Sequence, residues 1–390
     1  MPPRARRNTV SQRLRQVLVL SFTDHKRDPR VNRQLRALRR HYRVVAAGTG
    51  DSEIEDVRFV RIQISPRTTL VKANEATQLL LKRYEQYYWG QRHVAELERT
   101  LGGDAPALII ANDIETLPLA IKVAKGAKVV FDAHEYSPRE FEDRFAWRLI
   151  KQPYIDYLCH KYIGSAAAMM TVADGIAEEF GANFKVKPEV VLNAPKFHQL
   201  RASPVRAREF RMIHHGAAVP ARKIETMLQI MRDLDGRFRL DLMLIPTLPR
   251  YLESLKRRAA DDERIRFLDP VPMSELVAFG NAYDIGLYLL QPSSFNNLHA
   301  LPNKFFEFIQ SRLMIAVGPS PEMASLVQKY DCGVVANDFR PASLAHALGR
   351  LDVKEVERYK GNTGRAAEEL CFEQSSRKFL ALVAKTLGEA

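Results

Sequence analysis

The segment His299-Ala300-Leu301-Pro302-Asn303-Lys304-Phe305-Phe306-Glu307-Phe308 lies between two apolar runs, 283–290 and 313–318. The two runs indicate buried parallel strands, and residues 302–311 indicate the helix that joins them. Pro302 suits the first helical position, because its missing N–H would be unpaired there in any case. The free N–H groups and positive dipole end of this helix would point out of the carboxyl edge of the sheet. The segment therefore predicts a site for a phosphate or diphosphate.

The same alternation of short apolar runs and helical stretches continues through both halves of the chain, which has 390 residues. It predicts an α/β protein with two Rossmann-like, doubly wound parallel-sheet domains that face a cleft. We expect a basic arm at 1–16, a first domain at 17–198, a second domain at 205–372 and a terminal helix at 373–390. The expected strands are 17–21, 44–47, 108–111, 129–132, 169–172, 190–192, 212–215, 240–245, 265–268, 285–290, 314–317 and 334–336. The helices expected between the strands of the first half are 31–40, 71–101, 116–125, 140–167 and 175–180.

A net charge of +13 calls for an anionic partner, unless it is only a solvated basic surface. The arginines are scattered, and no nucleic-acid-binding motif is present, so we expect no nucleic acid. Residues 71–101 mix leucines and aromatics with Lys72 and Arg92. We expect them to form a long helix that either packs on the first domain or makes peripheral contact with an anionic membrane.

No apolar run approaches the ~20 residues of a membrane span, and the start of the chain lacks the apolar segment of a secretory signal. The three cysteines are widely separated and show neither metal spacing nor a disulfide framework. We therefore expect a cytoplasmic protein, at the inner face of the membrane if the basic surface contacts lipid.

Polar residues follow several of the expected strands. Asn112 and Asp113 follow 108–111, and His134 and Glu135 follow 129–132, which ends at Asp132. Ionisable groups at the carboxyl ends of parallel strands are where sites form, although the two aspartates could instead cap helices or strand ends.

The first expected strand is followed by a loop that contains His25 and then Asp28-Pro29-Arg30. Asp28 suits a helix N-cap and Pro29 the first helical position. This leaves His25 and Arg30 as the candidates for contact with a substrate.

The second half opens with the strand Arg211-Met212-Ile213-His214-His215, which runs into Gly216 and then Arg222-Lys223. Glycine lets the backbone approach a ligand closely, and two adjacent cations can neutralise a diphosphate. In so basic a chain the pair could be ordinary surface, but its place just after the opening strand favours a ligand.

These motifs resemble the retaining glycosyltransferases of family 4, which have the GT-B fold. The resemblance covers about 17–379 and is strongest at 132–135, 214–223 and 284–320. The family's donor signature is Glu, seven residues, Glu; here His299 and Glu307 stand at the two positions, so half of the carboxylate pair is missing. In that fold a terminal helix commonly crosses back onto the first domain, as 373–390 would.

The resemblance implies a role for each candidate residue. Glu307 would hold the ribose, and His134 would contact the transferred sugar, which makes these two the catalytic candidates. No metal and no cofactor are expected, because such enzymes can dispense with a metal and no Asp-x-Asp motif is present. The donor diphosphate would be bound by Gly216, Arg222, Lys223, His299 and Leu301, and the acceptor side would be formed by His25, Arg30, Asn112, Asp113 and Glu135.

The function implied is transfer of a sugar from a UDP- or GDP-linked donor to a polysaccharide, glycolipid or other acceptor, with retention of configuration. A nucleotide-sugar 2-epimerase of the same fold is one alternative. A non-enzymatic binding protein that uses its basic surface is the other, and the histidine at 299 keeps it open.

Overall fold

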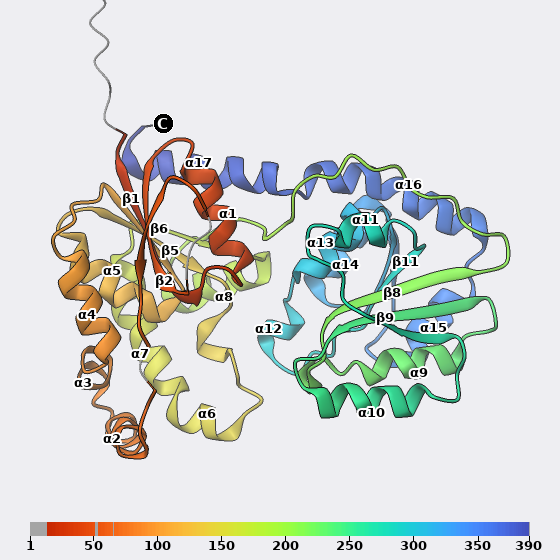
Figure 1. Ribbon diagram of the computed structural model, residues 1–390, viewed down its shortest axis with the longest axis horizontal. Helices are drawn as coiled ribbons and strands as arrows, with labels where there is room; N and C mark the ends of the chain where they lie inside the picture. The colour runs from red at the N-terminus through yellow and green to blue at the C-terminus, as the bar shows by residue number, and fades with distance from the viewer. Residues whose placement is uncertain (1–13, 51–53, 65, 390) are drawn as a thin grey trace, which may run out of the picture. The chain divides into compact units, whose positions relative to one another are not determined.

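The computed structural model describes residues 14–50, 54–64 and 66–389 (Figure 1). Most of the expected basic arm, at 1–16, lies outside these residues. The chain divides into two compact units. The domain boundaries expected from the sequence, 17–198 and 205–372, remain a prediction. Unit 1 comprises Met1–Asp132, Lys161–Ala168 and Leu380–Ala390, and unit 2 comprises Ala133–His160 and Met169–Phe379.

The first sheet has seven strands in the order β3-β2-β1-β4-β5-β6-β7, and its strands pair in parallel. The chain order reverses direction between β1 and β4, which makes these two strands the topological switch point. One strand, β3, was not expected from the sequence. The strands are β1 (Gln16–Asp24), β2 (Arg43–Thr49), β3 (Val57–Arg61), β4 (Leu108–Asn112), β5 (Lys128–Ala133), β6 (Ala168–Thr171) and β7 (Glu189–Val190).

The helices of the first half are mostly those expected, with α1 capped by Asp28 as its sequence indicates. They are α1 (Pro29–Leu38), α2 (Thr69–Leu80), α3 (Tyr84–Trp89), α4 (Arg92–Leu101), α5 (Leu117–Ala124), α6 (Phe145–Ile150), α7 (Gln152–Tyr162) and α8 (Asp174–Phe184).

Two long helices expected from the sequence are wrong in extent. Residues 71–101 form three helices, because Lys82 adopts a left-handed backbone (φ 55°) and Gly90 ends α3. Residues 140–167 likewise divide into α6, α7 and a short 3-10 turn. Apolar and aromatic residues run across the breaks, so the hydrophobic pattern alone does not mark where each helix ends.

The second sheet has six parallel strands in the order β10-β9-β8-β11-β12-β13, and its switch point lies between β8 and β11. The central strands β8, β9, β11 and β12 are mostly apolar and buried, as parallel strands covered by helices should be, whereas the edge strands β10 and β13 are only partly buried. They are β8 (Phe210–Ala217), β9 (Phe238–Ile245), β10 (Ile265–Leu268), β11 (Ile285–Tyr288), β12 (Met314–Val317) and β13 (Gly333–Val335).

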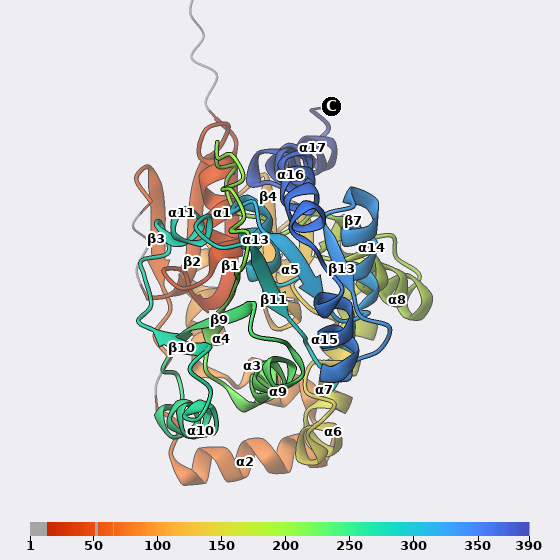
Figure 2. The same ribbon diagram turned by 90° about the vertical axis from the view of Figure 1, so that its right-hand side faces the viewer.

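Helices cover both faces of this sheet (Figures 1 and 2): α9, α10 and α15 lie on one face, and α11, α13, α14 and α16 lie on the other. Pro302 is the N-cap of α13 rather than its first helical residue. The helices are α9 (Glu225–Asp233), α10 (Pro249–Ala259), α11 (Leu276–Gly280), α12 (Phe295–Leu298), α13 (Asn303–Gln310), α14 (Pro321–Tyr330), α15 (Pro341–Gly349) and α16 (Val353–Glu369).

The terminal helix α17 (Phe372–Leu387) begins in unit 2 and ends in unit 1. At its end, the Leu387 carbonyl accepts a hydrogen bond from Arg15 (3.0 Å), and the Tyr42 hydroxyl donates to Glu389 (2.7 Å). The sequence expectation of a helix that returns to the first half of the chain is therefore confirmed. Among the described residues, no helix combines the length and apolar character needed to cross a bilayer.

Candidate functional site

A glycine turn ends β8 at the switch point of the second sheet. Gly216 has φ 130°, a backbone conformation that L side chains rarely adopt. A Cβ at this position would lie 2.8 Å from Nη1 of Arg222 and 3.1 Å from Nζ of Lys304. The absence of a side chain therefore lets two cationic groups converge on one point beside the backbone.

Lys304 lies in the first turn of α13 and is 6% exposed. Its ammonium is 3.1 Å from Nε2 of His214 and 4.4 Å from the centre of the Tyr288 ring. Nδ1 of His214 lies 2.9 Å from the Leu287 carbonyl, which can only accept, so Nδ1 carries the proton and Nε2 accepts from Lys304. The histidine thus orients the ammonium but brings no negative charge.

No carboxylate of the described residues forms an ion pair with Lys304 or Arg222. Burial, and then the charge of Arg222, lower the pKa of Lys304 well below its usual value, with Glu307 acting weakly in the opposite direction. Burial, Lys304 and Arg222 lower the pKa of the neighbouring His215 to about 3. The protein therefore supplies no negative charge that would stabilise the protonated form of Lys304 beside Arg222, and a bound anion would supply it.

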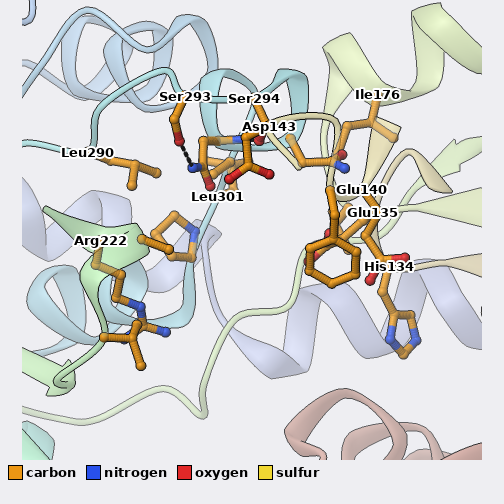
Figure 3. Close-up of a pocket in the computed structure, with 18 of the residues that line it drawn as sticks. His134, Glu135, Glu140, Asp143, Ile176, Arg222, Leu290, Ser293, Ser294 and Leu301 are labelled. Atoms are coloured by element: carbon orange, nitrogen blue, oxygen red, sulfur yellow. Dashed lines mark hydrogen bonds between the residues drawn. The ribbon is translucent and has the colours of Figure 1, made fainter. Parts of the chain in front are cut away.

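A pocket of about 480 Å³ lies within unit 2, a volume typical of small-molecule sites. In Figure 3, Arg222 and His134 lie on opposite sides of it. Its lining includes four of the residues that the sequence singled out: His134, Glu135, Arg222 and Leu301.

The short helix α12 fixes one wall of this pocket. Asn296 accepts from the Tyr136 N–H (2.8 Å) and donates to the Tyr136 carbonyl (3.1 Å). Glu142 accepts from the N–H of Phe295 (2.5 Å) and also pairs with Arg139. These contacts hold the segment that carries His134 and Glu135 against α12.

The pocket lining does not include four predicted donor residues, Gly216, Lys223, His299 and Glu307. Lys223 is exposed and has a left-handed backbone (φ 47°, ψ 47°) at the end of a short 3-10 turn. Glu307 is 6% exposed, and its Oε2 lies 3.7 Å from Nε2 of His215. Because the pKa of His215 is depressed to about 3, this contact joins a carboxylate to a neutral ring at pH 7.

His299, the departure from the family signature, contacts α14 and α8. Its Nδ1 lies 3.0 Å from Oε1 of Glu322, which also accepts from the N–H of Gly175 (2.8 Å). Its ring lies 4.5 Å from that of Phe295. Gly175 is necessary here, since a Cβ at that position would lie 2.1 Å from the His299 ring.

The switch point of the first sheet, in unit 1, holds a buried polar network. Arg30 donates to both carboxylate oxygens of Asp132, from Nε at 2.6 Å and from Nη2 at 2.5 Å. Gln34 donates to Asp132 (2.5 Å) and to Asn112 (2.9 Å). Two predicted acceptor residues, Arg30 and Asn112, are therefore brought together, and Arg30 is bound to a carboxylate.

The other two predicted residues of unit 1 differ in their environment. Asp113 has φ 65° and ψ 156°, a combination found essentially only for glycine, and its N–H donates to the Asp132 carbonyl (2.9 Å). His25 is buried against Gly48 and Phe59, and burial lowers its pKa. Such strain at a strand end is a common property of functional residues, which favours Asp113.

Sequence reasoning missed Lys304 and Asn296. A signal for Lys304 was present, because this lysine directly precedes the mostly apolar run Phe305-Phe306-Glu307-Phe308-Ile309 and would be buried with it if the helix is covered on all sides. No local pattern distinguishes Asn296 from its neighbour Asn297. Among the described residues, no group of three or more His, Cys, Asp or Glu side chains could hold a metal ion.

No protein-family model and no curated protein matches the chain. Solved structures do match along nearly its whole length. They include sucrose-phosphate synthase from Thermosynechococcus elongatus (TM-score 0.73, 11% identity, 96% of this chain and 100% of that one) and Anabaena HepE in complex with UDP-glucose (0.71, 13%, 95% and 100%). An α,α-trehalose-phosphate synthase (UDP-forming) from Burkholderia vietnamiensis also matches (0.68, 14%, 97% and 100%). Two parallel sheets of Rossmann type and this agreement over the full length lead to one conclusion: the chain has the fold of the GT-B glycosyltransferases.

Proposed function

We propose that this protein is a glycosyltransferase whose donor is a nucleotide-diphosphate sugar. The observation that carries the proposal is the pair Lys304 and Arg222, two cationic side chains that converge beside Gly216 without a carboxylate partner. A buried, unpaired ammonium is costly in a folded protein, and a bound anion would compensate it. A diphosphate has the charge and the size to contact both groups.

The same cations would assist the reaction. When the sugar leaves, negative charge develops on the diphosphate, and fixed cations in a poorly solvated site stabilise that charge strongly. The N–H groups at the start of α13, next to Leu301, would add hydrogen bonds to the phosphates. We assign the same end of the donor to Gly216 and, as predictions still to be tested, to Lys223 and His299.

The remaining roles follow the sequence expectations. Glu307 would accept hydrogen bonds from the ribose, and His134 would contact the transferred sugar. Glu135 and, in unit 1, His25, Arg30, Asn112 and Asp113 would serve the acceptor, which would be a saccharide or a lipid-linked sugar. In the retaining reaction the leaving phosphate itself would help to deprotonate the incoming hydroxyl, so that positioning and charge stabilisation would be the protein's main tasks.

UDP is the first nucleotide to test, because HepE, one of the similar structures, was solved with UDP and with UDP-glucose. We would measure binding of UDP, GDP and their sugars by titration calorimetry. Lys304→Met and Arg222→Gln should each weaken diphosphate binding about 10- to 100-fold, which is the effect of losing a charge-assisted hydrogen bond. The matched controls are Lys354→Met and Arg232→Gln, which remove exposed cations of the same types.

Equal affinity in the Lys304 and Arg222 variants and in their controls would refute the proposed diphosphate site. Product analysis then separates transferase from epimerase. A transferase releases free UDP or GDP faster when an acceptor is added, whereas an epimerase converts the donor to a second nucleotide sugar without one.

A further inference from the structure

The helix α6 in unit 2 is largely exposed to solvent. None of its six residues is buried, and Phe145 and Leu149 are 71% and 60% exposed. Because they are four positions apart, the two side chains lie on the same face of the helix. An exposed apolar pair of this kind on a short helix indicates a surface that another body covers.

Basic residues lie along this helix. Arg144 precedes it, Arg148 lies within it and Lys151 follows it, and residues 144–151 contain no acidic side chain, whereas Glu140, Glu142 and Asp143 lie in the segment before them. The Arg148 guanidinium lies 5.8 Å from the Phe145 ring, and that of Arg144 lies 4.7 Å from the Phe141 ring. Each cation therefore lies beside an aromatic ring, with its charged end at the edge of apolar surface.

We propose that α6 docks on an anionic lipid bilayer. Phe145 and Leu149 would enter the boundary between headgroups and acyl chains, while Arg144, Arg148 and Lys151 would contact lipid phosphates. The mixture of apolar and basic groups distinguishes this occupant from others. A nucleic acid would not require the exposed phenylalanine and leucine, and a purely apolar partner would not require the three cations.

The docking surface continues into the pocket. Phe141, Asp143 and Arg144 line the pocket, and the Trp147 ring of α6 packs edge-on against Phe141 (5.9 Å). Docking would therefore place this wall of the pocket at the lipid headgroups, where a lipid-linked acceptor is presented. That consequence rests on the proposed function, whereas the docking itself does not.

Vesicle sedimentation of the full-length protein tests the proposal, with phosphatidylglycerol–phosphatidylcholine vesicles compared with pure phosphatidylcholine. The wild type should bind the anionic vesicles at low salt, and Phe145→Ser/Leu149→Ser should bind at least about tenfold more weakly, since two apolar side chains no longer leave water. The control is Ile245→Ser/Met273→Ser, which removes two exposed apolar side chains elsewhere in unit 2 and should bind as the wild type does. UDP affinity should be equal in all three proteins, so that loss of docking is distinguishable from loss of the donor site.

A tryptophan on the exposed face of α6 provides a second measurement. The chain has two tryptophans, so the Trp89→Phe/Trp147→Phe/Phe145→Trp protein has one, on the face proposed to enter the lipid, and its emission should shift to the blue when anionic vesicles are added. Absence of binding by the wild type, equal binding to both kinds of vesicle, undiminished binding by the Phe145/Leu149 variant, or an unchanged emission of the Phe145→Trp protein would each overturn the proposal.

Discussion

The two switch points of this protein differ in whether a buried cation has a carboxylate partner. In unit 1, Arg30 is held by both oxygens of Asp132, and Gln34 and Asn112 complete the network. In unit 2, Lys304 is equally buried, but it faces a neutral histidine and another cation. The difference teaches that burial of a charge alone does not identify a binding site. A buried charge that the protein leaves uncompensated does.

The largest expected effect is on the paired network. Asp132→Ala should lower the free energy of unfolding by about 3–5 kcal/mol, because it leaves Arg30 buried without a counter-charge. Urea titration measures this change. As a control, Asp338→Ala removes the exposed partner of Arg340 and should leave the unfolding midpoint unchanged. A loss below about 1 kcal/mol for Asp132→Ala would remove the contrast between the two switch points.

Low pH should destabilise the folded protein through His215, the histidine beside Lys304 and Arg222. The pKa of this histidine is about 3 in the folded protein and near 6.5 in an unfolded chain, so the unfolded state binds more protons between these values. Stability should therefore be complete above about pH 6.5 and fall as the pH decreases toward 3. Urea titrations at pH 7 and pH 4 should show a loss on the order of 2–3 kcal/mol from this residue, and His215→Gln should show a correspondingly smaller loss.

Lys304→Met should behave in the opposite way to Asp132→Ala. Without ligand, replacing an uncompensated buried ammonium by an apolar side chain should leave the free energy of unfolding unchanged or raise it by about 1–2 kcal/mol. Thermal unfolding without UDP measures the stability of the free protein, and thermal unfolding with UDP measures the stabilisation that binding adds. The wild type should gain stability from UDP and the variant should gain little; a variant that unfolds more readily than the wild type in the absence of UDP would make Lys304 a structural residue.

Asp113→Gly examines the strained strand end of unit 1. Glycine adopts the backbone conformation of Asp113 without strain, so the variant should be more stable by about 1–2 kcal/mol. If Asp113 serves the acceptor, turnover should fall in the same protein. A variant that is both more stable and fully active would assign the strain to the fold and not to function.

The smallest effect is expected for Lys223→Gly. The left-handed backbone at Lys223 favours glycine, so stability should rise by about 0.5–1 kcal/mol. UDP affinity, measured in the same preparation, decides the role of this side chain. An unchanged affinity would leave Arg222 and Lys304 as the two cations of the site, whereas a tenfold loss would add Lys223 to them.

The strand positions and the fold class followed from the sequence, because buried parallel strands leave continuous β-branched runs and their connections leave helical periodicity. The polar positions at strand ends could also be predicted, because each of them directly follows one of these apolar runs. What could not be predicted was which charges find partners. Arg30 and Lys304 are both single basic residues near a helix start, and only the folded chain shows that one meets Asp132 and the other meets Arg222.

Helix ends were the weaker part of the prediction. The three helices between Thr69 and Leu101 carry a nearly continuous apolar pattern, and their breaks depend on the backbone of Lys82 and on Gly90. The environment of His299 was equally hidden, because Glu322 and Gly175 are far from it in the chain.

The fixed tautomer of His214 has a calorimetric consequence. Lys304 donates to a ring nitrogen that carries no proton, and its pKa is already depressed by burial and Arg222. A diphosphate beside it would raise that pKa, so at a pH between the pKa of Lys304 in the free protein and its pKa in the complex, binding would be accompanied by uptake of a proton. The heat of binding would then depend on the ionisation enthalpy of the buffer, and the number of protons absorbed would report the charge state of one lysine.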